Sequence, residues 1–425
     1  MKILFLTLLS LISLFLIFKS KIVKSESDFT IASRKLGSLD VSYIIIGTLV
    51  GGASTIGTVQ LAYTYGIAAW IFTLFSGVAC LILGLFFSKA LRSEEVITVS
   101  EFIGNKFGKD IRVYTSILSS FGMYIHIVAQ FLAAMSIIET VFGFGSLTSM
   151  LITFILILIF VLSGGIVSSS LIGKIKVFML YSLMILATIV VLTKQHGITN
   201  LIHSLPDKNM ISMFSYGKSK AIQDMIAMVI GVLSTQTYLQ AIFSAKDVKT
   251  ARNGAFLSAL LIPPIGLMGI LIGMYMRIHH PELINNTVVV FPYFLKLYFN
   301  PILTAIFLSF LTVIILGTAS GLTLGATTNM YVDVIKGRIK SRYKELTEIK
   351  ITAFLILTSS LIIVFSGLHS AILSWSYLSM GIRGSAIFLP LLFIILIKDE
   401  KILNKLKPIV FIAPILYILI SIALR

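Results

Sequence analysis

Long apolar runs recur along the whole chain and are separated by short polar segments. Most runs approach the roughly 20 residues that an α-helix needs to cross the hydrocarbon core of a bilayer. The pattern therefore predicts an all-α polytopic membrane protein with about 12 transmembrane helices. The expected spans are 3–18, 41–66, 68–88, 113–142, 146–165, 174–193, 223–245, 253–276, 301–330, 348–366, 371–397 and 406–424.

The composition agrees with this pattern and narrows the class of protein. Of the 425 residues, 57% are hydrophobic and 12% are charged, and the mean hydropathy is +1.02. Soluble domains do not have this composition, and no predicted loop is long enough to hold one. The single cysteine, Cys80, excludes a disulfide or a thiolate metal site within one chain. The chain is thus expected to form one membrane unit.

The net charge of +17 invites a comparison with nucleic-acid-binding proteins, but the positions of the charges argue against it. With the loop 19–40 placed inside, 25 of the 34 Lys and Arg residues fall in inside loops. Such a bias is the positive-inside pattern, in which basic loops lie beside the anionic lipids of the inner leaflet. We therefore expect no nucleic-acid partner, a multi-pass location in the cell membrane with both termini outside, and a prokaryotic plasma membrane because the loops are compact.

Residues 41–66 combine spanning length with many small and polar side chains. Each glycine costs a helix about 1 kcal/mol relative to alanine. Backbone freed at membrane depth is tolerated only where protein or water satisfies it, and such a break is a pointer to a transporter's binding site. Close helix packing through small residues is the alternative interpretation. The residues concerned are Gly47, Gly51, Gly52, Ser54, Thr55, Gly57, Thr58 and Gln60.

Ionisable residues within spans are functional candidates by default because burying them in a bilayer is costly. Arg383 lies near the middle of 371–397, where it is a candidate clamp for a carboxylate-bearing solute. Alternatively, Arg383 pairs with another group of the protein, or it lies nearer the end of its span than predicted and extends its side chain to the membrane surface. His126 and Gln130 lie one helical turn apart in 113–142 and so share a face. His126 is a candidate proton carrier or solute ligand, and a buried histidine bonded to a neighbouring helix is the favoured alternative.

Two further spans carry clusters of hydroxyl and amide groups. Residues 234–240, which include Gln236, lie within the span 223–245, and hydroxyl groups also follow one another along 301–330. Such hydroxyls either bond back to their own helix or supply oxygen ligands to a hard monovalent cation. No nucleotide-binding loop, nucleophile elbow or metalloprotease helix is present in the sequence, so the chain is not expected to be an enzyme or an ATP-driven pump.

Five segments, in order along the chain, resemble the sodium:solute symporter family. They are DFTIASRKLG (28–37), GGASTIGTVQLAYTYG (51–66), VSEFIGNKFG (99–108), QAIFSAKDVKTARNGA (240–255) and ILGTASGLTLGATTNMYVDVI (315–335). The resemblance implies a LeuT-type fold with a 5+5 inverted-repeat core, in which the first helix of each repeat is broken. The implied repeats are 41–193 and 223–397, with extra transmembrane helices at 3–18 and 406–424.

The resemblance also implies a sodium site and part of a solute site. The family's carbonyl ligands fall on Ala53, Ile56 and Ile314, and its two adjacent hydroxyls fall on Gly317 and Thr318. Thr318 keeps a hydroxyl, whereas Gly317 replaces the usual serine, so the resemblance implies Na⁺ as the coupling ion, bound at a weakened site. Gln60 aligns with a glutamine that contacts solute in sugar-transporting members, and Gln236 occupies the corresponding polar part of the second broken helix.

The sequence thus predicts a secondary active transporter that carries Na⁺ together with a small organic solute by alternating access. Arg383 favours an anionic or zwitterionic solute. The alternatives are a proton-coupled or uncoupled transporter of the same fold, or a membrane solute sensor that does not transport. The candidate solute ligands are Ser54, Thr55, Gln60, His126, Gln130, Gln236 and Arg383, and membrane lipids are the other expected partner.

Overall fold

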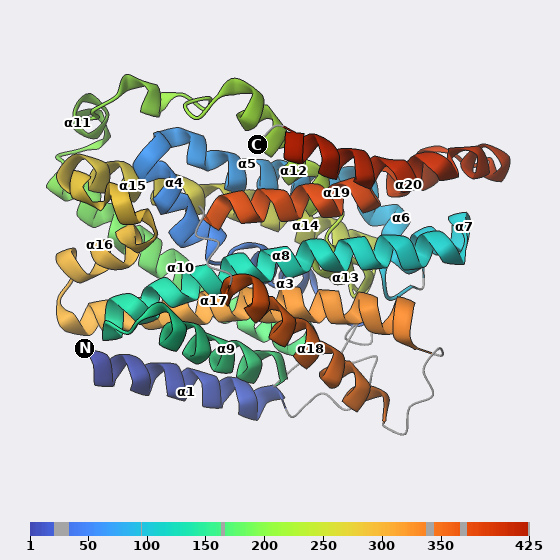
Figure 1. The fold of residues 1–425 in the computed structure, drawn as a ribbon, viewed down its shortest axis with the longest axis horizontal. Coiled ribbons are helices and arrows are strands. Elements are labelled where there is room, and N and C mark those ends of the chain that lie inside the picture. Colours follow the sequence, from blue (N-terminus) through green and yellow to red (C-terminus); the bar gives the residue numbers. More distant parts are fainter. Residues whose placement is uncertain (21–33, 95, 163–165, 337–343, 366–371, 424–425) are drawn as a thin grey trace.

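The computed structural model describes residues 1–20, 34–94, 96–162, 166–336, 344–365 and 372–423, and within them it is built from helices (Figure 1). In these segments nine helical stretches are long and apolar enough to cross a membrane, and three shorter apolar helices accompany them. The long helices lie roughly along one common direction, which is horizontal in Figure 1. The prediction of an all-α polytopic protein is therefore confirmed.

The described helices overlap the predicted spans, with differences in boundaries and with some spans divided between two helices. They are α1 (Lys2–Ser20), α3 (Ser38–Leu49), α4 (Thr58–Tyr65), α5 (Trp70–Ile82), α6 (Ser88–Arg92), α7 (Val99–Phe107), α8 (Lys109–Phe142), α9 (Ser146–Leu162), α10 (Ile166–Lys194), α11 (Ile198–His203), α12 (Lys218–Val232), α13 (Gln236–Phe243), α14 (Val248–Leu261), α15 (Pro263–His279), α16 (Val290–Tyr298), α17 (Pro301–Asn329), α18 (Glu345–Phe365), α19 (Ile372–Leu396) and α20 (Glu400–Ala423).

The two spans predicted to be broken are broken. Helix α3 ends at Leu49, Val50 has extended backbone (φ −90°, ψ 100°), and a π-helical turn at Ala53–Gly57 leads into α4. Helix α12 ends at Val232, and Thr235 is extended (φ −84°, ψ 119°) before α13 begins. Both breaks lie within buried stretches of the chain. They expose backbone polar groups inside the protein, where only side chains, ions or solutes can satisfy them.

Helix α10 begins at Ile166 rather than at residue 174, which corrects the predicted boundary. Lys174 and Lys176, two of the 25 basic residues that the charge count assigns to inside loops, lie within this helix. The side chain of Lys174 is exposed, whereas Lys176 is buried with only 1% of its surface accessible. The prediction failed because the first turns of the helix are rich in hydroxyl groups and glycine, so the apolar pattern starts late.

Loops assigned to one side of the membrane meet at one end of the molecule. At the end predicted to lie inside, the Nε atom of Arg92 donates to the carbonyl of Ala245 at 2.5 Å. At the other end, which holds the N-terminus and α16 in Figure 1, Lys2 Nζ donates to the carbonyl of Phe142 at 3.3 Å. The alternation of the loops is therefore as predicted, and which end faces the cytoplasm remains a prediction.

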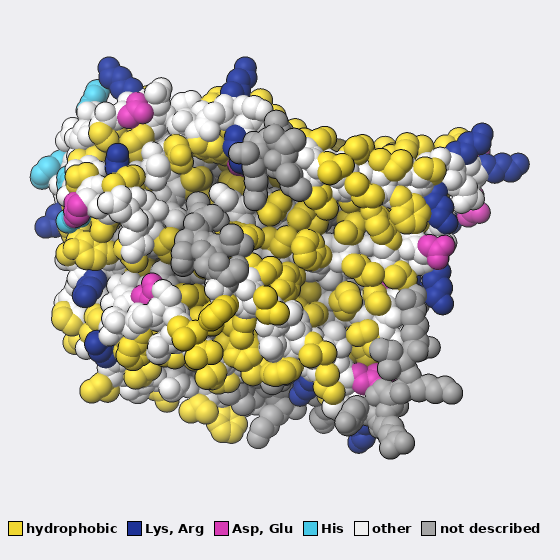
Figure 2. All heavy atoms as spheres, in the orientation of Figure 1, with side chains coloured by type: hydrophobic (Ala, Val, Ile, Leu, Met, Phe, Trp, Pro, Cys, Tyr) yellow, Lys and Arg dark blue, Asp and Glu magenta, His cyan; other side chains and the backbone are white. Residues whose placement is uncertain are grey.

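The outer surface between these ends is apolar. Figure 2 shows hydrophobic side chains over the middle of one face and Lys and Arg at both ends. Large side chains such as Phe178 (74% exposed), Ile362 (72%) and Leu260 (71%) point outward from three different helices. The interior, in contrast, holds many buried Ser, Thr, Gln and Gly residues. This inverted distribution is that of a multi-pass membrane protein whose outside meets lipid.

Candidate functional site

The break between α3 and α4 is packed against α8 and α17 through Gly51 and Gly52. A Cβ atom at Gly51 would lie 2.4 Å from Thr318 Oγ1 and 2.7 Å from Gln130 Oε1, so no larger residue fits. The backbone N–H of Gly52 donates to Gln130 Oε1 at 2.8 Å. The glycines therefore allow close packing of the neighbouring helices. They also lie where the helix is interrupted, and the side-chain amide of Gln130 accepts a hydrogen bond from the backbone N–H that the interruption leaves unpaired.

Thr318 brings α17 to the oxygen atoms at this break. Its Oγ1 lies 3.2 Å from the carbonyl oxygen of Gly47 and 3.2 Å from that of Val50. The resemblance had placed the carbonyls of Ala53 and Ile56 in this role, six residues further along the chain. The structure brings the earlier pair to Thr318 because the helix ends at Leu49, ahead of the π-helical turn that holds the later pair.

The remaining members of the predicted cation site, Ile314 and Gly317, are buried on α17 in the turn before Thr318. Gly317 contributes no side-chain oxygen, as the sequence shows. The oxygen atoms that the described residues place around Thr318 are thus one hydroxyl and two main-chain carbonyls. They are hard, neutral ligands of the kind that suits an alkali cation.

Sequence reasoning missed a lysine at this same position. Lys176, on α10, donates from Nζ to Thr318 Oγ1 at 2.6 Å and to the carbonyl of Gly47. An ammonium group therefore lies on two of the three oxygen atoms just described. No signal in the sequence distinguishes Lys176 from the other basic residues near span ends except its position two residues from Lys174, which places the two on different faces of a helix.

Arg383 is fully buried on α19 and faces α8. Its Nη2 atom donates to Ser379 Oγ at 2.9 Å and to His126 Nδ1 at 3.1 Å. Because arginine only donates, Nδ1 of this histidine is assigned as the acceptor and the ring as the neutral Nε2–H tautomer. His126 is thus a buried histidine bonded to a neighbouring helix. Among the described residues no carboxylate lies within ion-pair distance of Arg383.

Several buried polar atoms near the two breaks have no hydrogen-bond partner within the described part of the chain. They include Nε2 of Gln130, Nε2 of His126, Oγ of Ser234 and Oγ1 of Thr237. Buried polar groups are nearly always bonded in proteins, so these atoms are candidates for hydrogen bonds to water or to a polar solute. The atoms come from α8 and from the second broken helix, which are the elements that a central solute site requires.

Three other predicted solute ligands have structural partners in this conformation. Ser54 and Thr55 donate to carbonyls of their own broken helix, at 3.2 Å and 2.8 Å. The amide of Gln236 accepts from the N–H of Val99 at 2.9 Å and donates to the carbonyl of Ile97 at 3.0 Å. Gln236 therefore ties α13 to the start of α7, and the structure does not bring it together with Gln130 and Arg383.

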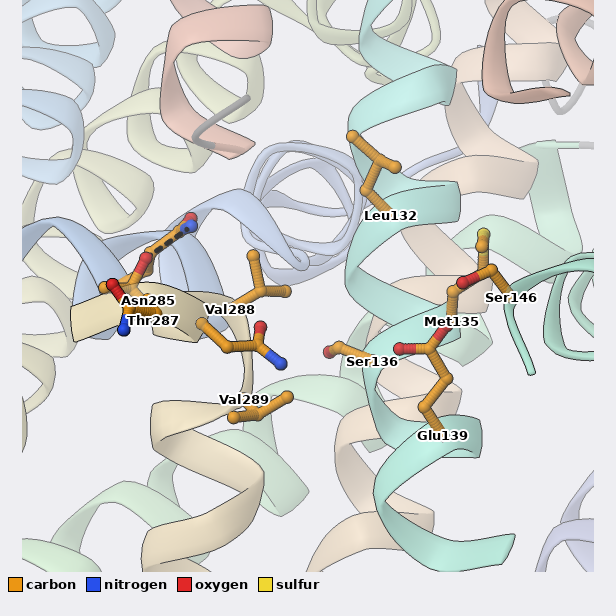
Figure 3. A pocket seen from close by; sticks show the side chains of 11 residues that line it. Leu132, Met135, Ser136, Glu139, Ser146, Asn285, Thr287, Val288 and Val289 are labelled. Carbon is orange, nitrogen blue, oxygen red and sulfur yellow. Dashed lines mark hydrogen bonds between the residues drawn. The ribbon is translucent and has the colours of Figure 1, made fainter. Parts of the chain in front are cut away.

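Gln60 lies on the wall of a cavity between α8, the start of α9 and the segment Pro281–Val289 (Figure 3). Its amide donates to Thr287 Oγ1 at 3.1 Å and accepts from the N–H of Ile372 at 3.1 Å. The cavity has a volume of about 460 Å³, which suits a small organic molecule. Its lining residues are Gln60, Leu132, Met135, Ser136, Glu139, Ser146, Asn285, Asn286, Thr287, Val288 and Val289.

This cavity lies toward the end predicted to face outside. Leu132 is six residues beyond His126 on α8, which corresponds to roughly 9 Å along the helix axis. Gln130 lies between them, so the cavity and the buried polar atoms follow one another along the same helix.

At the opposite end a polar network is centred on Asp333, directly after α17, and it borders a second cavity of about 460 Å³. The buried carboxylate accepts from Arg112 Nε at 2.7 Å and from Thr98 Oγ1 at 3.0 Å and 2.9 Å. Arg112 also pairs with Glu101 at 3.4 Å. The network joins α7, α8 and the end of α17, so it fastens together the elements that would separate if the protein opened at this end.

Replacing Asp333 with asparagine should loosen this network. Breaking a buried ion pair commonly costs about 3–5 kcal/mol, and we expect about 2 kcal/mol here because Arg112 is partly exposed. Thermal unfolding of the purified protein in detergent should show a melting temperature lower by several degrees. Glu400→Gln is the matched control, because it breaks an exposed pair with Lys106 and should have almost no effect. Equal melting temperatures for the two variants would remove Asp333 from this stabilising role.

Two interrupted helices within a bundle of apolar helices are the features of a multi-pass membrane protein with the LeuT-type fold. The family model described as "Sodium:solute symporter family" matches residues 29–400. The chain belongs to this family, as the five segments predicted. It is a family of transporters and not of enzymes.

Similar proteins agree with this assignment. A Bacillus subtilis (strain 168) protein called an uncharacterized symporter, YwcA, is 22% identical over 279 residues, which are 64% of this chain and 54% of that protein. The chain therefore matches about half the length of this curated relative.

Solved structures show the same fold at low sequence identity. A Na⁺-coupled sialic acid symporter has a TM-score of 0.78 at 15% identity, covering 98% of this chain and 96% of that one. Mhp1, a nucleobase-cation-symport-1 family transporter, has a TM-score of 0.63 at 14% identity, covering 86% and 81%. MhsT in complex with L-phenylalanine has a TM-score of 0.60 at 14% identity, covering 90% and 98%. The fold prediction is confirmed.

Proposed function

We propose that this chain is a secondary active transporter that moves Na⁺ and a small organic solute together, by alternating access. The observation that carries the proposal is the cluster of oxygen atoms from Thr318, Gly47 and Val50 at the first helix break. It lies inside a chain whose family is described by sodium:solute symport. The Na⁺-coupled symporter among the structural neighbours supports the same ion.

We further propose that the solute carries a carboxylate. Arg383 is a fully buried cation whose described partners are neutral, and an uncompensated buried charge is costly. An anionic group bound between α8 and the second break would remove that cost. The polar atoms of His126, Gln130 and Thr237 that have no partner would then bind the rest of the solute.

The proposed architecture has two inverted repeats, 41–193 and 223–397, with α1 and α20 outside them. The two observed breaks support this division, since each lies in the first helix of a repeat. Both termini are proposed to lie outside because of the positive-inside bias, and a prokaryotic plasma membrane is proposed because the loops are compact. In the conformation described here the network at Asp333 links α7, α8 and the end of α17 at the proposed inside end, and the cavity at Gln60 lies toward the proposed outside.

Uptake into proteoliposomes tests the proposal. Labelled amino acids, other carboxylates and sugars should be offered to liposomes that contain the purified protein, with an inward Na⁺ gradient or with K⁺ in its place. We expect at least one carboxylate to accumulate only with the Na⁺ gradient. Accumulation that ignores Na⁺ but follows a pH gradient would overturn the proposed coupling, and uptake of none of the classes would overturn the solute assignment.

Replacing Thr318 with alanine should weaken the dependence on Na⁺. The variant removes the only side-chain oxygen among the three described at the break. An interaction between a neutral polar group and a charged group contributes about 1.5–3 kcal/mol of binding free energy. The Na⁺ concentration for half-maximal uptake should rise about tenfold. Thr323→Ala is the control on the same helix, because that hydroxyl bonds back to the carbonyl of Ala319 at 2.8 Å. A value unchanged from that of the wild type would exclude Thr318 from the ion site.

A further inference from the structure

Helix α10 crosses α3 at very short distance just before Lys176. A Cβ atom at Gly173 would lie 2.0 Å from the carbonyl oxygen of Tyr43, so the two backbones touch at this glycine. Lys176 follows three residues later, on the same face of α10. The glycine crossing thus places the lysine stem beside the end of α3, from which its ammonium reaches the carbonyl of Gly47 and the hydroxyl of Thr318.

The ammonium has no acidic counter-charge at this position. Among the described residues no Asp or Glu lies within ion-pair distance of Lys176, and its two hydrogen-bond acceptors are neutral oxygens. A lysine side chain is rarely buried without a partner charge. Its stabilising contacts are therefore the oxygens that converge on the helix break, and these are two of the three oxygens that the proposed function gives to Na⁺.

A Na⁺ ion and this ammonium cannot occupy the position together. The Nζ atom is 2.6 Å from Thr318 Oγ1, which leaves no room for a second ligand of that oxygen on the same side. Two positive charges in contact at a site of low dielectric also repel strongly, with no anion nearby to offset them. Withdrawal of the ammonium takes rotation of the flexible four-carbon stem of the lysine.

We propose that Lys176 is a tethered cation that competes with Na⁺ for the oxygens of Gly47 and Thr318. With the lysine in place, its ammonium links α10 to α3 and α17 as a bound ion would, and Na⁺ enters only when the side chain withdraws. The inference rests on the proposed function in one respect, namely that Na⁺ is the ion that uses this position. Lys176 is then a determinant of the apparent Na⁺ affinity of the transporter, although it is not itself an ion ligand.

Na⁺ binding to charge-removing variants tests this inference. Equilibrium binding of ²²Na⁺ should be measured for the purified wild-type protein and for Lys176→Met and Lys176→Gln. Lys176→Met retains the packing because methionine fills a similar volume. Lys176→Gln retains a hydrogen bond because its amide can donate to the Gly47 carbonyl. We expect both variants to bind Na⁺ at least tenfold more tightly than the wild type. Lys174→Met, an exposed position on the same helix, should bind as the wild type does.

The outcomes separate this inference from the proposed function. If folded Lys176→Met and Lys176→Gln bind Na⁺ no more tightly than the wild type, the competition does not exist, whatever uptake assays show. If both variants gain affinity while wild-type solute uptake ignores Na⁺, the competition stands and the sodium coupling of the wild type fails. A gain in Lys174→Met equal to that in the Lys176 variants would show a general charge effect and would also overturn the inference. Monodispersity and melting temperature establish that each variant is folded.

Discussion

Replacing Gly51 with alanine is expected to abolish solute uptake. The added methyl group would lie 2.4 Å from Thr318 Oγ1 and 2.7 Å from Gln130 Oε1, so the broken helix, α17 or α8 must shift. Overpacking of this kind costs about 1–3 kcal/mol in stability, which a protein with so large a buried interior should survive. Displacement of binding groups by about 1 Å can lower a rate about 100-fold, and we expect at least that loss here.

The initial rate of solute uptake per folded protein measures this effect. Gly145→Ala is the control, since a Cβ atom at Gly145 would meet no atom within 4 Å and its backbone is not left-handed. The control should transport at the wild-type rate. Uptake by Gly51→Ala within twofold of the control would show that the close approach of Thr318 and Gln130 to this glycine is irrelevant to transport.

Replacing Arg383 with glutamine is expected to abolish transport of a carboxylate solute while the protein stays folded. The guanidinium is fully buried without a described carboxylate partner, so its removal leaves no opposite charge unpaired. Loss of a desolvated charge pair with the solute should cost about 2–5 kcal/mol, or at least a 30-fold loss of affinity. Arg383→Lys should also transport poorly, because an ammonium cannot contact His126, Ser379 and a carboxylate in the same planar geometry.

Competition binding with the transported carboxylate measures this loss directly. Arg252→Gln is the control, because Arg252 is exposed and stacks over Phe256 at 5.3 Å. A variant Arg383→Gln that binds and transports the carboxylate as the wild type does would make Arg383 a structural residue, held by Ser379 and His126 alone.

The positions of the spans and of both helix breaks follow from the sequence. In a chain of this composition, apolar runs of spanning length are best explained as transmembrane helices. Glycines together with hydroxyl residues at 41–66 indicate a place where a helix has low stability. The family resemblance supplied the second break at 223–245, which the structure shows between Val232 and Gln236. These features depend on local composition and on chain order, which a single sequence displays.

The register of the carbonyl oxygens that lie beside Thr318 did not follow from the sequence. Carbonyl oxygens three residues apart occur at Gly47 and Val50 as well as at Ala53 and Ile56, and glycines lie near both pairs. Which turn unwinds depends on the neighbours: Gln130 accepts from the N–H of Gly52 and so stabilises the earlier break. That contact joins residues 78 positions apart, and no local pattern predicts it.

The partners of Lys176 and Gln236 did not follow from the sequence for a related reason. The positive-inside rule assigns lysines near span ends to loops, whereas Lys176 is carried into the protein by the close crossing of α10 and α3. Gln236 was expected at the solute because it is polar and lies within a span, but its amide binds the backbone of the segment before α7. In both cases the partner of the side chain decides its role, and that partner is distant in sequence.

The most direct test of Na⁺–solute symport is the movement of the ion itself. Wild-type proteoliposomes should be given ²²Na⁺ outside, with and without the carboxylate that the uptake panel identifies, and the rate of ²²Na⁺ entry should be recorded. Symport predicts that the carboxylate accelerates ²²Na⁺ entry into wild-type liposomes and has no effect on liposomes with Arg383→Gln. Entry of the carboxylate with no change in the rate of ²²Na⁺ entry would contradict it.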